Sequence, residues 1–233
     1  NQQDSFSILA GEDALVLVLA DGMGGYTGGE LASRAAVEGC SRAFERKSGL
    51  PGERMKAAVT AANEQVWSAR KKRGEDDEMG TTLVAAWIGA DGLRWVSVGD
   101  SLLLLIREEK MFLLNELHQY SAELERMADE GIISREEALS HPARHSLTSA
   151  LMGKEVPLVD LREECFPLFP GDRVLVASDG VGPYLDSLGP AGMRYLSMLS
   201  AEELVRSVLD GINRDGAPNQ DNATLICAEI ARA

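Results

Sequence analysis

The chain has 233 residues, of which 45% are hydrophobic and 26% are charged, and its formal net charge at pH 7 is −14. This composition is that of an ordinary globular protein and excludes wholesale disorder. The negative charge repels nucleic acid and anionic lipid, so we expect neither nucleic acid nor a membrane as a partner. The same charge suits a protein that gathers divalent cations.

The predicted elements begin with two strands, over residues 5–10 and 14–20, joined by a loop of hairpin length. The sequence DGMGGYTGG then leads into a helix from residue 30 to about residue 47, where apolar residues recur near the 3.6-residue period. A second helix is predicted over residues 53–73. Three strands follow over 81–88, 93–98 and 102–107, and a fourth over 110–114.

The segment 115–147 differs from its surroundings, because it is polar, helical in patches, and interrupted by Gly131 and Pro142. We interpret it as an inserted helical excursion. Strands resume over 159–165 and 173–178, followed by a helix over 201–212 and a last strand over 223–230. Strands in consecutive hairpins with separate long helices indicate an α+β fold, either antiparallel or layered α/β/β/α. A doubly wound parallel sheet would need a helix between most strands.

Neither a membrane span nor a secretory leader is expected. The longest apolar runs, 14–20 and 102–106, are far shorter than the ~20 residues that cross a bilayer. The opening NQQDSF has no basic or apolar leader region, and the missing initiator Met indicates that residues lie upstream of Asn1. The three cysteines are scattered and form no CxxC pair, which favours a reducing compartment. We therefore expect a cytoplasmic protein.

Aspartates stand at the ends of several predicted strands. Three follow a strand and one, Asp221, precedes one; the three are Asp21, Asp100 and Asp179. In an antiparallel sheet the end of one strand lies beside the start of its neighbour, so these four side chains could converge on one edge. Asp4, just before the first strand, could join them.

Each Asp-Gly pair has a simpler interpretation as a turn, because both residues tolerate positive φ. Asp91-Gly92 serves as an internal control, since strands flank it on both sides and it is expected to be a hairpin turn without function. Asp21-Gly22 and Asp179-Gly180 differ from it, because no partner strand follows either pair. Together they favour a shared site over independent turns.

Carboxylates that converge repel one another unless a cation lies between them. A cluster of oxygen ligands without His or Cys suits Mg²⁺ or Mn²⁺, and such sites often hold two ions that share a carboxylate. Two such cations acidify a shared water and bind phosphoryl oxygens. The reaction class that follows is hydrolysis of a phosphate ester, which needs no nucleophilic Ser or Cys.

Seven motifs then stand in the order known from one enzyme family. They are NQQDSF, LADGMGGYTGGELAS, MGTTLVAAWI, VSVGDS, HPARHSLTSALMG, LVASDGV and NQDNATLI. In these motifs the chain resembles the bacterial branch of the metal-dependent protein serine/threonine phosphatases, the PPM or PP2C family. The resemblance runs from residue 1 to about residue 230. It implies one PP2C-like domain over 1–233, with two packed antiparallel sheets flanked by helices and a flap at about 115–147.

The resemblance also implies ligands for two Mn²⁺ or Mg²⁺ ions. It gives Asp21 as the carboxylate that bridges the ions and Gly22 as a ligand through its carbonyl. It gives Asp179 and Asp221 as ligands that complete the other ion's shell. Asp4 would act directly or through water, and Asp100 would help to hold a third, weaker ion. Asp21 and Asp179 would then be catalytic through the hydroxide that the metals generate.

The activity implied is hydrolysis of phosphoserine and phosphothreonine in proteins, by a metal-bridging hydroxide and without a phosphoenzyme. The partners implied are phosphorylated proteins, the targets of a serine/threonine kinase. Four features depart from the family pattern. Leu102 follows GDS, Leu117-His118-Gln119 replaces Asp-His-Ser, Pro183 replaces an acid, and the usual phosphate-binding Arg would fall before Asn1.

Two alternatives therefore stay open. One is a catalytically degenerate member that serves as a regulatory binding module. The other is a two-metal hydrolase of a small phosphorylated metabolite.

Overall fold

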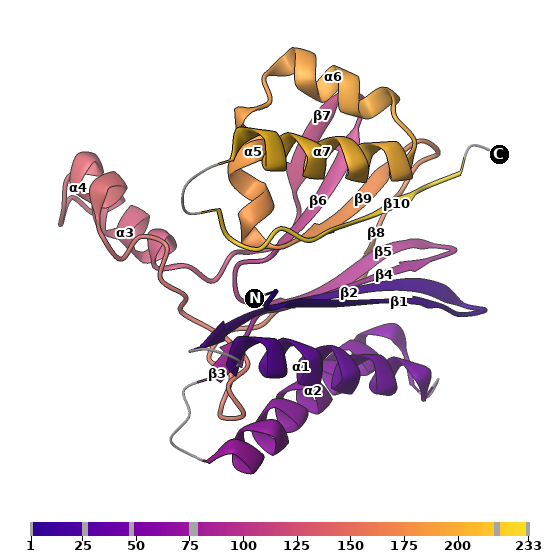
Figure 1. Ribbon diagram of the computed structural model, residues 1–233, viewed down its shortest axis with the longest axis vertical. Helices are drawn as coiled ribbons and strands as arrows, with labels where there is room; N and C mark the ends of the chain where they lie inside the picture. Colours follow the sequence, from indigo (N-terminus) through magenta and orange to yellow (C-terminus); the bar gives the residue numbers. More distant parts are fainter. Residues whose placement is uncertain (1, 25–27, 47–48, 75–78, 217–219, 232–233) are drawn as a thin grey trace.

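The computed structural model describes residues 2–24, 28–46, 49–74, 79–216 and 220–231. Two antiparallel sheets lie face to face between two layers of helices (Figure 1). This arrangement confirms the predicted α+β class and the layered sandwich.

The first sheet has the strand order β1-β2-β4-β5-β8, with β3 paired to β2 beyond the end of β4. Its strands are β1 (Asp4–Ala10), β2 (Ala14–Gly24), β3 (Met79–Thr81), β4 (Leu83–Gly89), β5 (Gly92–Val98) and β8 (Asp160–Phe166). The outer face of this sheet is covered by α1 (Gly28–Glu45) and α2 (Pro51–Arg73).

The second sheet has the order β10-β9-β6-β7. Its strands are β6 (Leu102–Arg107), β7 (Lys110–Leu113), β9 (Arg173–Ala177) and β10 (Leu225–Glu229). A short 3₁₀ turn, η1 (Asp179–Val181), follows β9. The outer face of the second sheet is covered by three helices, α5 (Gly182–Ser187), α6 (Pro190–Met198) and α7 (Ala201–Asp215).

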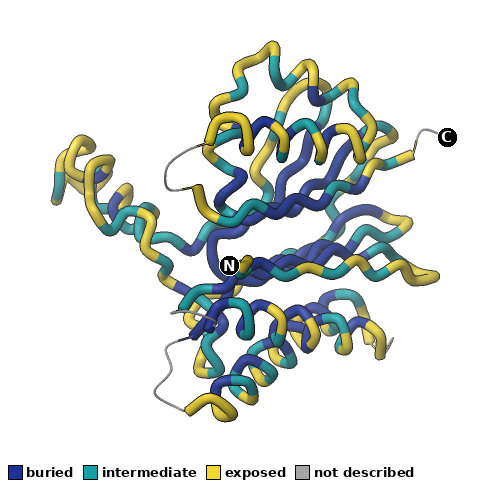
Figure 2. The backbone as a smooth tube through the Cα atoms, in the orientation of Figure 1, coloured by how far each residue is buried: buried dark blue, intermediate teal, exposed yellow. Residues whose placement is uncertain are grey.

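Alternation along the strands produces three apolar layers. Between the sheets, Leu17 and Leu19 of β2 pack with Leu103 of β6 and Val176 of β9. The side chains that alternate with these point outward to the helices. The second sheet does not cover the inner face of the first sheet at its edge strand, β1. There Phe6, opposite Leu19, is 58% exposed, and Ile8, opposite Leu17, is 53% exposed (Figure 2).

The segment 115–147, which we call the flap, contains α3 (Tyr120–Asp129) and α4 (Arg135–Ser140) and projects away from both sheets (Figure 1). Its two ends meet at a neck, where Gln119 and Leu147 form an antiparallel bridge. Within the described ranges, no helix is long and apolar enough to cross a membrane.

Two predicted strands differ from those in the structure, and two helices were not predicted. The strand predicted to stop at residue 20 runs on to Gly24, because β3 supplies hydrogen-bonding partners for Gly22 to Gly24. The single strand predicted over 81–88 is divided into β3 and β4. The helices α5 and α6 were not predicted, because both are short and have little room for a clear apolar period.

The hairpin between β6 and β7 turns on two residues with positive φ, Glu108 at 50° and Glu109 at 65°. These are the backbone angles of a type I′ turn, which favours Asn-Gly. We expect the double substitution Glu108→Asn/Glu109→Gly to stabilise the fold by about 1 kcal/mol, because it removes left-handed strain from glutamates. Urea denaturation measures this gain. An unchanged or lower midpoint would contradict it.

Candidate metal centre

The first two predicted site residues come together through strand pairing. Asp4 begins β1 and lies directly opposite Asp21 in the β1-β2 ladder. Asp4 is only 9% exposed and Asp21 is partly buried. The backbone of Asp21 is fixed by two threonines, because its N–H donates to Thr82 Oγ1 at 2.9 Å and its carbonyl accepts from Thr81 Oγ1 at 2.8 Å.

The second sheet contributes the next two aspartates. Asp179 follows β9 in η1, and Asp221 precedes β10, the strand that pairs with β9. Ser178 links this pair to the first sheet, because its hydroxyl donates to Asp4 Oδ2 at 2.8 Å and accepts from the Thr224 N–H at 2.9 Å. Asp4 and Ser178 are 174 residues apart in the chain.

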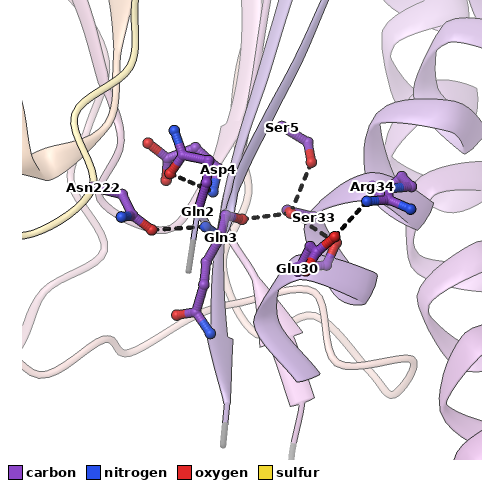
Figure 3. Close-up of polar contacts among 8 residues, drawn as sticks. All are labelled: Gln2, Gln3, Asp4, Ser5, Glu30, Ser33, Arg34 and Asn222. Atoms are coloured by element: carbon purple, nitrogen blue, oxygen red, sulfur yellow. Dashed lines mark hydrogen bonds and ion pairs between the residues drawn. The ribbon is translucent and has the colours of Figure 1, made fainter. Parts of the chain in front are cut away.

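A second link joins the N-terminal strand to the loop before β10 and to α1 (Figure 3). The N–H of Gln3 donates to Asn222 Oδ1 at 2.7 Å, and the Ser33 hydroxyl donates to the carbonyl of Gln3. Asn222 adjoins Asp221, so this contact holds the loop that carries Asp221 against β1. Sequence analysis missed Ser178 and Asn222, although each directly adjoins a predicted aspartate.

Asp100 follows β5 and is 6% exposed. Its Oδ2 accepts a hydrogen bond from Gln119 Nε2 of the flap at 2.8 Å. Burial raises the pKa of Asp100, against the lowering effect of this hydrogen bond. Asp100 and Asp221 both raise the pKa of Asp179 electrostatically, after the larger effect of burial.

Among the site aspartates, Asp21 has a strongly raised pKa. Burial raises the pKa of Asp21 to about 9, and the carboxylates of Asp4, Asp179 and Asp221 contribute to the rise. Such a shift means that the protein itself provides too little positive charge for the carboxylates that face one another. A cation at this point would relieve the repulsion.

Two further observations bear on whether these residues suit a metal. Asp4 Oδ1 and Asp179 Oδ1 are buried without any hydrogen-bond partner. Buried carboxylate oxygens are normally paired, so both have capacity for a ligand, and hard oxygen donors are those that Mg²⁺ and Mn²⁺ prefer. Within the described part of the chain, no three Asp, Glu, His or Cys side chains form a ready-made ligand cluster. In type and charge, but not as a closed cluster of three ligands, the carboxylate oxygens fit a hard divalent cation.

The control residue behaves differently from the site aspartates. Asp91 stands in the turn of the β4-β5 hairpin, where Gly89 pairs with Gly92. It is exposed and forms an ion pair with Arg94, with 2.6 Å between Oδ2 and Nη2. Its interpretation as a plain hairpin turn is confirmed.

Gly22 allows a close backbone contact beside Asp21. A Cβ atom added there would lie 2.0 Å from the carbonyl oxygen of Gly29, at the start of α1, and 2.8 Å from that of Gln3. We expect Gly22→Ala to destabilise the fold by about 1–3 kcal/mol, as overpacking does. Thermal denaturation tests this, with Gly182→Ala as control because its Cβ would meet Leu102 at an ordinary 3.6 Å. Equal losses in both variants would contradict the expectation.

Known proteins are similar to this chain in sequence and in fold. A family model described as protein phosphatase 2C matches residues 1–212. The serine/threonine protein phosphatase PstP of Mycobacterium tuberculosis is 32% identical over 235 residues, which cover 99% of this chain but 42% of PstP. The serine/threonine phosphatase stp of Listeria innocua is 32% identical over 171 residues, which cover 71% of this chain and 66% of that protein. The chain thus spans less than half the length of the mycobacterial relative.

Solved structures agree with this match. The crystal structure of Mycobacterium tuberculosis PstP/Ppp superposes with a TM-score of 0.77 at 31% identity, covering 100% of this chain and 93% of that chain. A structure of the PstP catalytic domain in complex with two manganese ions gives a TM-score of 0.75 at 29% identity, with the same coverage.

Proposed function

Because the chain belongs to the protein phosphatase 2C family, we propose that it hydrolyses phosphoserine and phosphothreonine in proteins with two bound Mn²⁺ or Mg²⁺ ions. The observation that carries the proposal is that Asp4 lies opposite Asp21 in the first sheet and accepts a hydrogen bond from Ser178, the neighbour of Asp179 at the end of β9 in the second sheet. A relative of the same fold holds two manganese ions.

The residues that would hold the ions are Asp21, through its carboxylate, Gly22, through its carbonyl, and Asp179 with Asp221. Asp4 would contribute directly or through water, and Asp100 would help with a third ion. Such ions, when bound, supply positive charge for the phosphoryl oxygens and lower the pKa of water that attacks phosphorus.

The protein's own contribution is to hold these oxygens in place before substrate arrives. Thr81 and Thr82 fix the backbone of Asp21 from both sides. Ser178 occupies one oxygen of Asp4 and leaves the other, Oδ1, free of protein partners. Preorganised groups of this kind lose little free energy to reorganisation during the reaction. No Ser or Cys is required as a nucleophile, so no phosphoenzyme is expected.

The partners we propose are phosphorylated proteins that a serine/threonine kinase modifies, and the compartment we propose is the cytoplasm. The name of the mycobacterial relative supports the substrate class. The compartment rests on the three cysteines, each of which is free.

A catalytically degenerate regulatory module is the second candidate. The altered GDS motif, which Leu102 follows, and the altered flap motif Leu117-His118-Gln119 favour it. All the expected metal-binding aspartates are present, which favours the enzyme. A hydrolase of a small phosphorylated metabolite would use the same ions. The substrate that it prefers distinguishes it from a protein phosphatase.

The deciding experiment compares three substrates under one set of conditions. Phosphate release from a phosphothreonine peptide is measured with Mn²⁺, then with excess chelator, beside a phosphoserine peptide and a sugar phosphate. We expect hydrolysis of both peptides that stops on chelation. Preference for the sugar phosphate would favour the metabolite hydrolase, and no hydrolysis by a folded protein that binds Mn²⁺ would favour the regulatory module.

A further inference from the structure

The flap neck contacts the core at the Gly99-Asp100 turn after β5. The His118 N–H donates to the Gly99 carbonyl at 2.9 Å, and the Gly99 N–H donates to His118 Nδ1 at 3.1 Å. The Thr148 N–H donates to the His118 carbonyl at 2.8 Å, which ties the second leg of the flap to the first. His118 thereby holds both legs next to the backbone of Gly99.

One side chain extends this attachment from the backbone to a carboxylate. Gln119 Nε2 donates to Asp100 Oδ2 at 2.8 Å, while the backbone of Gln119 forms the bridge with Leu147 across the neck. The Tyr120 N–H adds a bond to the Ser146 carbonyl at 2.9 Å. Gln119 is therefore in contact with Asp100 on one side and with the returning leg of the flap on the other.

This contact leaves Asp100 with a defined orientation. Asp100 is buried, so its carboxylate has few ways to rotate, and Gln119 occupies Oδ2. Thr82 connects this turn to Asp21, because its Oγ1 accepts from the Asp21 N–H at 2.9 Å and lies 2.7 Å from Oγ of Ser101, the residue after Asp100. The charge of Asp100 also raises the pKa of Asp179. A cation shared by Asp100 and Asp179 would thus meet a carboxylate whose position depends on the flap neck.

We propose that Gln119 is a positioning residue, whose side-chain amide orients Asp100 for a divalent cation and couples occupancy of that site to the position of the flap neck. The inference rests on one part of the proposed function, namely that a divalent cation binds near Asp100. Hydrogen-bond partners of metal-binding carboxylates commonly change metal affinity 10–100-fold when they are removed. A merely structural Gln119 would stabilise the neck without changing cation affinity.

The test uses Gln119→Met, which keeps the length of the side chain and removes its amide. Ser121→Ala is the matched control, because it removes a polar group two residues further along and none of the bonds described above. Mn²⁺ is titrated into each full chain, and bound ions are counted by electron paramagnetic resonance. Asp100→Asn identifies which ion depends on Asp100. Hydrogen exchange of the His118, Tyr120 and Thr148 amides is measured with and without Mn²⁺.

We expect Gln119→Met to weaken the Asp100-dependent Mn²⁺ about 10-fold and to leave the tighter ions unchanged. The neck amides should exchange faster than in the wild type and should no longer respond to that ion. Unchanged affinity for that ion in Gln119→Met would overturn the proposal, and so would a wild-type titration without any ion that Asp100→Asn weakens. If these expected effects occur in a chain that does not hydrolyse phosphopeptides, the proposed activity fails and the positioning role stands.

Discussion

Asp21→Asn is expected to abolish hydrolysis of a phosphothreonine peptide while the protein stays folded. Asp21 faces three other carboxylates, and it is the one whose pKa their charges and its burial raise to about 9. The substitution keeps the shape of the side chain and removes the charge that would be shared between two cations. Loss of one preorganised electrostatic group costs about 10²–10³-fold in rate, and loss of a shared ligand should cost at least the upper end of that range.

The matched control for this variant is Asp91→Asn. Both aspartates precede a glycine near a strand end, so the two substitutions are chemically identical and local sequence is similar. Asp91 lies in a hairpin turn beside Arg94, and its loss should remove only an exposed ion pair worth at most about 1 kcal/mol. Initial rates with saturating Mn²⁺ and circular dichroism of each variant provide the comparison. Full activity in folded Asp21→Asn would refute the assigned role of Asp21.

The fold could be predicted from local patterns wherever those patterns decide the structure. Hairpin loops and alternating strands place β4, β5 and β6 in order, and apolar periodicity places α1 and α2. The extension of β2 to Gly24 could not be predicted, because it depends on pairing with β3, more than fifty residues later in the chain. The helices α5 and α6 each have a proline among their first two residues, Pro183 and Pro190, a signal for a helix start that periodicity alone does not use.

The site divides in a similar way. The positions of the predicted strand ends were sufficient to identify four candidate ligands, because antiparallel pairing places the end of one strand beside the start of the next. These candidates are Asp4, Asp21, Asp179 and Asp221. The side chains that orient them were not predictable, since Ser178 reaches Asp4 and Gln119 reaches Asp100 only through the packing of distant segments. The position of Gln119 was visible in the sequence as a departure from the family pattern, but its contact was not.

The second large effect expected is on thermal stability. Carboxylates that repel one another oppose folding, and a cation that binds only the folded state stabilises it. At a Mn²⁺ concentration of about 100 times Kd, one site contributes about 2.7 kcal/mol, which corresponds to a rise in Tm of about 5–10 °C for a chain of this size. Differential scanning fluorimetry with Mn²⁺ or with excess chelator measures the shift.

Asp179→Asn separates this effect from general screening by salt. In chelator the variant should melt at or above the wild-type Tm, because it removes one charge from a site where Asp100 and Asp221 already oppose Asp179. In Mn²⁺ it should lose most of the shift, because a ligand is missing. Asp91→Asn should shift as the wild type does, and NaCl at equal ionic strength should produce little change. If Asp179→Asn instead melts below the wild type in chelator and keeps the full Mn²⁺ shift, the carboxylate serves the fold and the cation binds elsewhere.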